Sequence, residues 1–126
     1  MASITCFEDI IAWQKARLLT QLIYKAFGTN RDFGFRDQMQ RASVSIMNNI
    51  AEGFERQTPK DFAHYLRMAK ASCGEVRSML YLVEDLQYLT AAQKEELHAL
   101  TIEIARLILG LAASLSHRTS SLGTRN

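Results

Sequence analysis

A row of polar side chains within residues 38–56 contains the residue types in this chain that could support binding chemistry. Its members recur at steps of three and four residues, which places them on one side of an α-helix. They are Gln38, Arg41, Ser45, Asn48 or Asn49, and Glu52. Apolar residues such as Met39, Ile46 and Phe54 alternate with this row and cover more than one side. We therefore expect the helix to be covered on two sides, with the polar row beside buried surface.

The polar row has two interpretations, and the sequence leaves both open. In the first, it is a structural hydrogen-bond network, because buried polar groups are costly unless they are paired. Arg41 would then pair with Glu75 or with a partner near Glu52, across helices or across subunits, and Ser72 would belong to the same network. Such a network can set helix register or subunit arrangement. In the second interpretation, the same residues bind a small molecule or RNA.

A row of basic residues is the second candidate site. It consists of Lys60, Arg67, Lys70 and Arg77. These residues recur at helical spacing, with His64 beside them, and such a row could follow a phosphate backbone. The alternative is a solvated charged face. Asp61 and Glu84 lie close in sequence and no aromatic residue interrupts the row, which favours that alternative.

Catalytic patterns are not found in the sequence. The histidines, at positions 64, 98 and 117, form no pair with metal-ligand spacing. There is no glycine-rich phosphate loop, and Ser43 and Ser45 lie in no nucleophile-elbow motif. Glu52 and Glu75 could meet as a carboxylate pair, but no other residue places a substrate beside them. We predict that the protein is not an enzyme and has no catalytic residues, cofactor or metal site.

Length and composition favour a single helical domain. The chain has 126 residues, of which 48% are apolar, with six glycines and one proline, Pro59. Few turn-forming residues are typical of a helical protein, and this length suits one domain. The formal net charge of +2 gives no support to a dedicated nucleic-acid-binding protein, which is more often strongly basic.

The cysteines and the apolar segments predict a cytoplasmic protein that does not enter a membrane. Cys6 and Cys73 lie on separate elements without a motif, which is typical of reduced thiols. The first residues carry acidic rather than basic side chains, unlike a signal peptide. The richest apolar segment, 102–115, contains Glu103 and Arg106, so we predict no membrane span.

Hydrophobic periodicity predicts four helices, at about residues 7–27, 35–54, 59–87 and 91–116, followed by a frayed tail over 117–126. Capping signals mark three of the helix starts. They are the pair Thr5 and Glu8, the sequence Thr58-Pro59, and the pair Thr90 and Gln93. The connections are short, so we predict an all-α, antiparallel, up-down-up-down four-helix bundle in one domain.

The two middle helices carry more apolar residues than one bundle core needs. In helix 59–87, two apolar rows run side by side at steps of three and four residues, and the row predicted to face the core is Phe62, Leu66, Ala69, Cys73, Val76, Leu80 and Val83. The candidates for the excess are Trp13, Tyr65, Met68, Met79 and Tyr81. Exposed apolar surface of this kind usually marks an interface, and a head-to-tail contact between identical subunits that closes would form a ring.

Three segments, FEDIIAWQKA, QMQRASVSIMNNIAEGFER and KDFAHYLRMAKASCGEV, resemble the 23S rRNA-intervening-sequence protein family of small four-helix bundles, which is related to the accessory variability determinant of diversity-generating retroelements. The resemblance covers about Phe7 to Tyr88. It implies a homopentameric ring. It also implies a set of signature positions: Gln38, Arg41, Ser45, Asn49, Glu52 and Gly53, with Ser72 and Glu75 on the next helix.

These observations lead to two functional hypotheses. The first is a non-enzymatic, homo-oligomeric scaffold or adaptor. The second is an accessory protein that binds RNA or DNA through a basic surface of the ring that includes the basic row.

Overall fold

The computed structural model describes residues 4–123, and the side chains of residues 4–115. A short 3-10 helix, η1 (Phe7–Asp9), precedes four α-helices: α1 (Ile11–Phe27), α2 (Phe33–Glu55), α3 (Pro59–Asp85) and α4 (Ala91–Gly123). No strand occurs in the described part of the chain. The prediction of an all-α protein with four long helices is confirmed.

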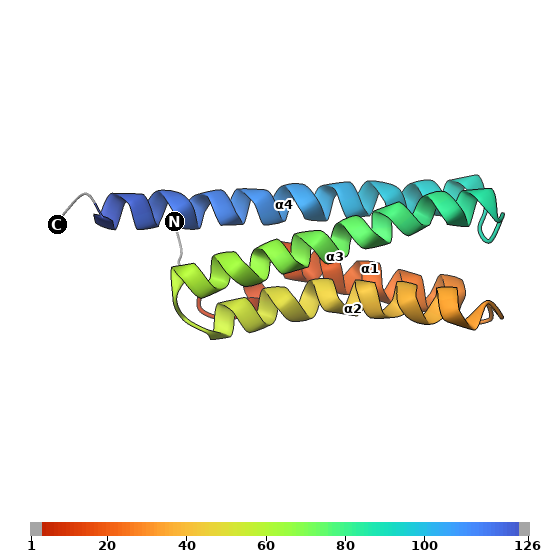
Figure 1. The fold of residues 1–126 in the computed structure, drawn as a ribbon, viewed down its shortest axis with the longest axis horizontal. Coiled ribbons are helices and arrows are strands. Elements are labelled where there is room, and N and C mark those ends of the chain that lie inside the picture. Colours follow the sequence, from red (N-terminus) through yellow and green to blue (C-terminus); the bar gives the residue numbers. More distant parts are fainter. Residues whose placement is uncertain (1–3, 124–126) are drawn as a thin grey trace.

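The four helices lie side by side as a bundle (Figure 1). The α1–α2 and α3–α4 connections lie at one end of the bundle, and the α2–α3 connection lies at the other. Each helix packs against two others, so that the order around the bundle is α1, α2, α3, α4 and back to α1. The backbones of α2 and α4 do not approach each other, and these two helices therefore lie on opposite corners.

The core consists of one apolar stripe from each helix. In α3 this stripe matches the predicted one, and all its members are buried: Phe62, Leu66, Ala69, Cys73, Val76, Leu80 and Val83. The steps of four and three residues keep these side chains on one side of the helix. Each large side chain in such a stripe contributes about 1.5–3 kcal/mol on full burial, so the stripes determine which way each helix faces.

Two of the three predicted helix starts are confirmed. The Thr58 side chain accepts a hydrogen bond from the Asp61 amide, with Pro59 at the first position of α3. Thr90 and Gln93 form a reciprocal capping box before α4. The predicted start at Thr5 is wrong, because no side chain caps η1 or α1, and α1 begins only at Ile11.

The cap of α2 was not predicted. Asp32 accepts a hydrogen bond from the Phe35 amide, so α2 begins at Phe33, two residues before the predicted start. Its other carboxylate oxygen accepts a hydrogen bond of 2.6 Å from the Tyr88 hydroxyl. Phe35 in turn packs edge-on against Tyr88, with ring centroids 5.4 Å apart. One acidic side chain thus caps a helix and ties together the two connections at this end of the bundle.

The helices end close to, but not at, the predicted positions. α3 ends at Asp85, and Gln87 then takes a left-handed conformation with φ of 56°. The Tyr88 amide bonds to the Val83 carbonyl and the Gln87 amide to the Glu84 carbonyl, which is a Schellman ending. α4 continues to Gly123, beyond the predicted end at Ser116. Of the tail predicted to be frayed, residues 124–126 lie outside the described residues.

α4 is unusually apolar for its degree of burial. Within the described residues, its stretch Ala91–Leu115 is long and apolar enough to cross a membrane, with a mean hydropathy of 1.5. Core helices of soluble bundles can be equally long and apolar, but they are mostly buried, whereas only 28% of the apolar stretch of α4 is buried. α4 therefore presents apolar surface that its own bundle does not cover.

α2 and α3 come into close contact at Gly53. A Cβ atom built at Gly53 would lie 2.7 Å from the Tyr65 Cβ and 3.0 Å from the Phe62 Cδ1. Both neighbours belong to the first turns of α3, where the backbone holds them in place. Gly53 is therefore required by packing, although glycine within a helix costs about 1 kcal/mol relative to alanine.

We expect Gly53→Ala to lower the free energy of unfolding by about 1–2 kcal/mol, because overpacking outweighs the gain in helix propensity. Urea unfolding followed by circular dichroism would measure the change. Gly74→Ala is the matched control, since a Cβ at Gly74 meets nothing within 4 Å. The free energy of unfolding of this control should rise by up to about 1 kcal/mol. Equal effects at both positions would contradict the close contact.

Candidate polar groove between α2 and α3

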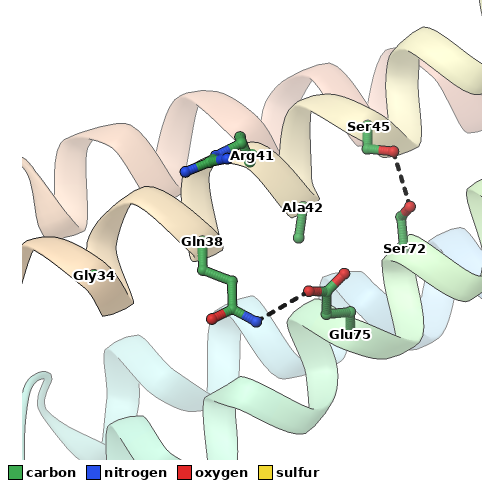
Figure 2. A pocket seen from close by; sticks show the side chains of 7 residues that line it. All are labelled: Gly34, Gln38, Arg41, Ala42, Ser45, Ser72 and Glu75. Carbon is green, nitrogen blue, oxygen red and sulfur yellow. Dashed lines mark hydrogen bonds between the residues drawn. The ribbon is translucent and has the colours of Figure 1, made fainter.

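A groove of about 570 Å³ lies on the surface between α2 and α3 (Figure 2). Its lining comes from one side of each helix: Gly34, Gln38, Arg41, Ala42 and Ser45 from α2, and Ser72 and Glu75 from α3. Three of the α2 residues, Gln38, Arg41 and Ser45, belong to the predicted polar row, and Gly34 and Ala42 do not. Sequence reasoning therefore identified the residues of the groove, but not that they line a hollow.

At one end of the groove, an amide and a carboxylate join the two helices. The Gln38 Nε2 donates a hydrogen bond of 3.2 Å to the Glu75 Oε2 (Figure 2). Both residues are exposed. The remaining carboxylate oxygen of Glu75 makes no hydrogen bond to another described side chain, and it is available to a further donor.

At the other end, a compact cluster of small polar side chains joins the helices. The Ser45 and Ser72 hydroxyls lie 2.9 Å apart and share one hydrogen bond. The Asn49 Nδ2 donates to the Ser45 carbonyl, at 2.8 Å, and to the Ser45 hydroxyl, at 3.0 Å. All three residues are half-buried. These short side chains satisfy one another without a ligand, as the network interpretation requires.

Arg41 and Glu52 do not join this network. Arg41 is exposed, and its guanidinium makes no ion pair with any described residue. In Figure 2 its side chain extends along α2 rather than toward Glu75. Within the subunit the expected pairing of Arg41 with Glu75 or near Glu52 is therefore wrong, and its pairing across subunits stays a prediction. A long guanidinium keeps its hydration by staying at the surface, and no burial forces it to find a carboxylate.

Glu52 pairs instead within its own helix. Its carboxylate lies 3.1 Å from the Arg56 guanidinium, and the same guanidinium donates a hydrogen bond of 2.8 Å to the Tyr65 hydroxyl. The bond to Glu52 raises the pKa of Arg56. The predicted row is thus divided into separate contacts: Gln38 with Glu75, the serine–asparagine cluster, Glu52 with Arg56, and the unpaired Arg41.

The basic row lies on the outside of α3. Lys60, Arg67 and Lys70 are exposed and Arg77 is half-buried, and none of them makes an ion pair with a described residue. His64 is also exposed and lies edge-on to the ring of Tyr65. The two acids close to the row in sequence do not pair with it. Glu84 pairs with Lys94 at 3.0 Å, and Asp61 makes no ion pair with a described residue.

The two cysteines differ in environment, and neither resembles a nucleophile. Burial raises the pKa of the Cys73 thiol to about 11, and Arg77 and Lys70 oppose this shift. The Cys73 thiol donates to the Thr101 carbonyl at 3.2 Å. A hydrogen bond to Asp9 raises the pKa of the Cys6 thiol. Both thiols are therefore protonated at neutral pH, and among the described residues no group of side chains could hold a metal ion.

The residues expected to carry excess apolar surface fall into three groups. Met68 is 44% exposed and Tyr81 is 55% exposed, which agrees with the expectation. Trp13 and Tyr65 are half-buried. Met79 is only 8% exposed and belongs to the core, so its assignment to the excess is wrong. Leu82 on α3 and Leu86 directly after it are exposed and were not among the candidates.

The fold and the groove define a small all-α bundle protein with a polar surface groove and no arrangement of catalytic groups within the described residues. The sequence model of the 23S rRNA-intervening sequence protein family matches residues 8–110. The chain belongs to this family.

Comparison with solved structures agrees with this assignment. The chain is similar to a protein of unknown function from the S23 ribosomal protein family of Bacteroides thetaiotaomicron. The two share 26% sequence identity with a TM-score of 0.75, over 80% of this chain and 97% of the other. A search of curated proteins finds no match. No enzymatic activity is indicated by the family or by the structural relative.

We expect Arg41→Met to change the free energy of unfolding of the separated subunit by less than about 0.5 kcal/mol, because the side chain is exposed and unpaired. Ser72→Ala should lower the free energy of unfolding by about 1 kcal/mol, because it removes the hydrogen-bond partner of the half-buried Ser45 hydroxyl. Urea unfolding at micromolar and lower protein concentrations would compare the two variants. A loss of several kcal/mol for Arg41→Met at every concentration would show that Arg41 stabilises the subunit itself.

Proposed function

We propose that this protein is a non-enzymatic scaffold or adaptor that assembles into a ring of identical four-helix bundles. Each bundle has the antiparallel up-down-up-down topology, which is supported by the short connections at alternating ends in Figure 1. The number of subunits, five, comes from the family resemblance. Two free cysteines support a reducing compartment, and we propose that the protein acts in the cytoplasm and not in a membrane.

Exposed apolar surface is the observation that carries this proposal. On α3, three large apolar side chains are exposed, Met68, Tyr81 and Leu82, and Leu86 directly after the helix is exposed as well. Scattered apolar residues are normal at a surface, but a run of them along one helix is typical of an interface. Leu18 on α1 and Leu109 on α4 extend this surface to other sides of the bundle. A subunit in a ring contacts neighbours on two different sides, which agrees with this distribution.

We expect the purified protein to have a mass in solution close to five times the 14.3 kDa of one chain. Light scattering after size-exclusion chromatography would measure this mass across a dilution series. Met68→Glu should weaken the assembly, because it places a charge in a surface that the neighbour desolvates. Gln21→Glu, which adds the same charge at an exposed polar position of α1, is the control. A single-chain mass at micromolar concentration would refute the proposal.

A second candidate function is nucleic-acid binding through the basic row. Its support is the absence of ion pairs at Lys60, Arg67, Lys70 and Arg77 within the described residues. Basic side chains that no acid neutralises remain available to phosphates. A ring would repeat the row on every subunit, which would strengthen weak contacts by multivalency. The net charge of +2 limits this strengthening.

If the basic row is the contact, binding to a generic single-stranded RNA should weaken as salt rises. Four phosphate contacts per subunit give a slope of log K against log salt of about −3. Fluorescence anisotropy at several salt concentrations would measure the slope. Reversing all four charges should abolish binding, whereas reversing Glu96, an exposed acid on a different helix, should not weaken it. If the protein does not bind the RNA at low salt, the proposal of nucleic-acid binding is wrong.

A further inference from the structure

α4 carries a second row, partly apolar, on its outer side, away from the core. The row recurs at steps of four and three residues: Glu95, Ala99, Ile102, Arg106, Leu109 and Ala113. Ile102 is half-buried and the others are exposed, with Leu109 at 53%. The inner side of the same helix already supplies the core, through buried residues such as Leu97, Ile104 and Ile108. Apart from Ile102, the outer row is therefore not covered by the rest of the subunit.

The spacing and the charges of the outer row favour a protein partner over a lipid one. Steps of four and three residues are typical of a helix that packs along another helix. Glu103 and Arg106 lie within the apolar stretch Ala91–Leu115 of α4. A charged side chain at the centre of a bilayer costs about 2.5–3.5 kcal/mol even on the insertion scales that give the lowest values. A helix partner accommodates these charges if it offers opposite ones.

The groove between α2 and α3 offers a surface on which a helix with this row can pack. Its floor is formed by small residues, Gly34, Ala42 and Ser45, which allow a helix to approach closely. A Cβ at Gly34 would meet nothing within 4 Å. On α3, the exposed Met68 and Leu82 lie in the same helical row as the groove residues Ser72 and Glu75.

The charges of the two surfaces are complementary. In the groove, the Glu75 carboxylate accepts a hydrogen bond from Gln38. Arg41 lies three residues after Gln38, or about 4.5 Å further along α2. On α4, Arg106 belongs to the outer row, whereas the Glu103 carboxylate pairs with Lys15 of α1 at 3.2 Å. Arg41 and Arg106 make no ion pair within the described residues, and Glu75 bonds only to Gln38. The groove thus presents a carboxylate that is bonded only to Gln38, and the outer face of α4 presents an unpaired guanidinium, that of Arg106.

We propose that the outer face of α4 docks into the α2–α3 groove of a second copy of this chain, with Arg106 against Glu75. The contact must form between copies, because α2 and α4 lie on opposite corners of one bundle. It joins two different faces, and it is therefore a head-to-tail contact that generates a ring if it closes. The inference rests on the proposed self-assembly and identifies the surfaces that perform it.

A charge swap tests the contact. Arg106→Glu should raise the dissociation constant of the assembly at least about tenfold, because it sets like charges against each other. Glu75→Arg should do the same, and the double variant should recover most of the loss. Sedimentation velocity over a dilution series would measure these constants, and circular dichroism would verify that each subunit is folded. Arg67→Glu, which reverses an exposed and unpaired arginine of α3, is the matched control and should have little effect.

A second pair of variants tests the groove by shape. Gly34→Leu should fill the groove and disrupt the assembly without unfolding the subunit, whereas Gly74→Leu, at an equally open helical glycine outside the groove, should not. If the wild-type protein assembles and the swap or the groove variants have no effect, this contact is wrong while self-assembly stands. A wild-type monomer refutes both proposals. A monomer that floats with lipid vesicles would instead assign the outer face of α4 to a membrane.

Discussion

A four-helix bundle can bury one stripe along each of its helices, and this constraint determines the rest of the structure. The stripes of α1 to α4 meet in the centre and account for the buried core. Any second row on a helix, whether polar or apolar, must then lie between two neighbouring helices or on the outside. In this protein α2 has a second row that is polar, while α3 and α4 have second rows that are partly apolar. These rows give the molecule surfaces that its own fold does not use.

Residue size along the α2–α3 contact decides where the two helices touch and where a hollow remains. At Gly53 the missing side chain admits Phe62 and Tyr65 of α3. Further along, Ala42, Ser45 and Ser72 are small, but no large side chain enters the space they leave. The groove is therefore a consequence of small residues facing each other, and it opens to solvent beside charged groups.

The groove resembles a recognition surface more than a catalytic one. Its serine and asparagine side chains are paired with one another, which holds them in place but leaves no free nucleophile or base. Its charged groups, Arg41 and Glu75, are exposed, and neither is placed against a second titratable group that could exchange a proton. Such groups contribute specificity to a contact between macromolecules, where complementary charges set register. The scaffold function that we propose uses the groove in this way.

The sequence by itself determined the number of helices, most of their limits and the buried stripe of α3, because periodicity and capping depend on neighbouring residues. It also identified the polar row and its partners Ser72 and Glu75. It did not determine the cap at Asp32, which depends on a tie to the distant Tyr88, or the environment of Arg41. Only the tertiary structure decided that short side chains pair across the helices while the long guanidinium remains in solvent. The physical reason is that helical spacing gives the side of a helix on which a residue lies, whereas its pairing depends on the separation and size of the residues on the neighbouring helix.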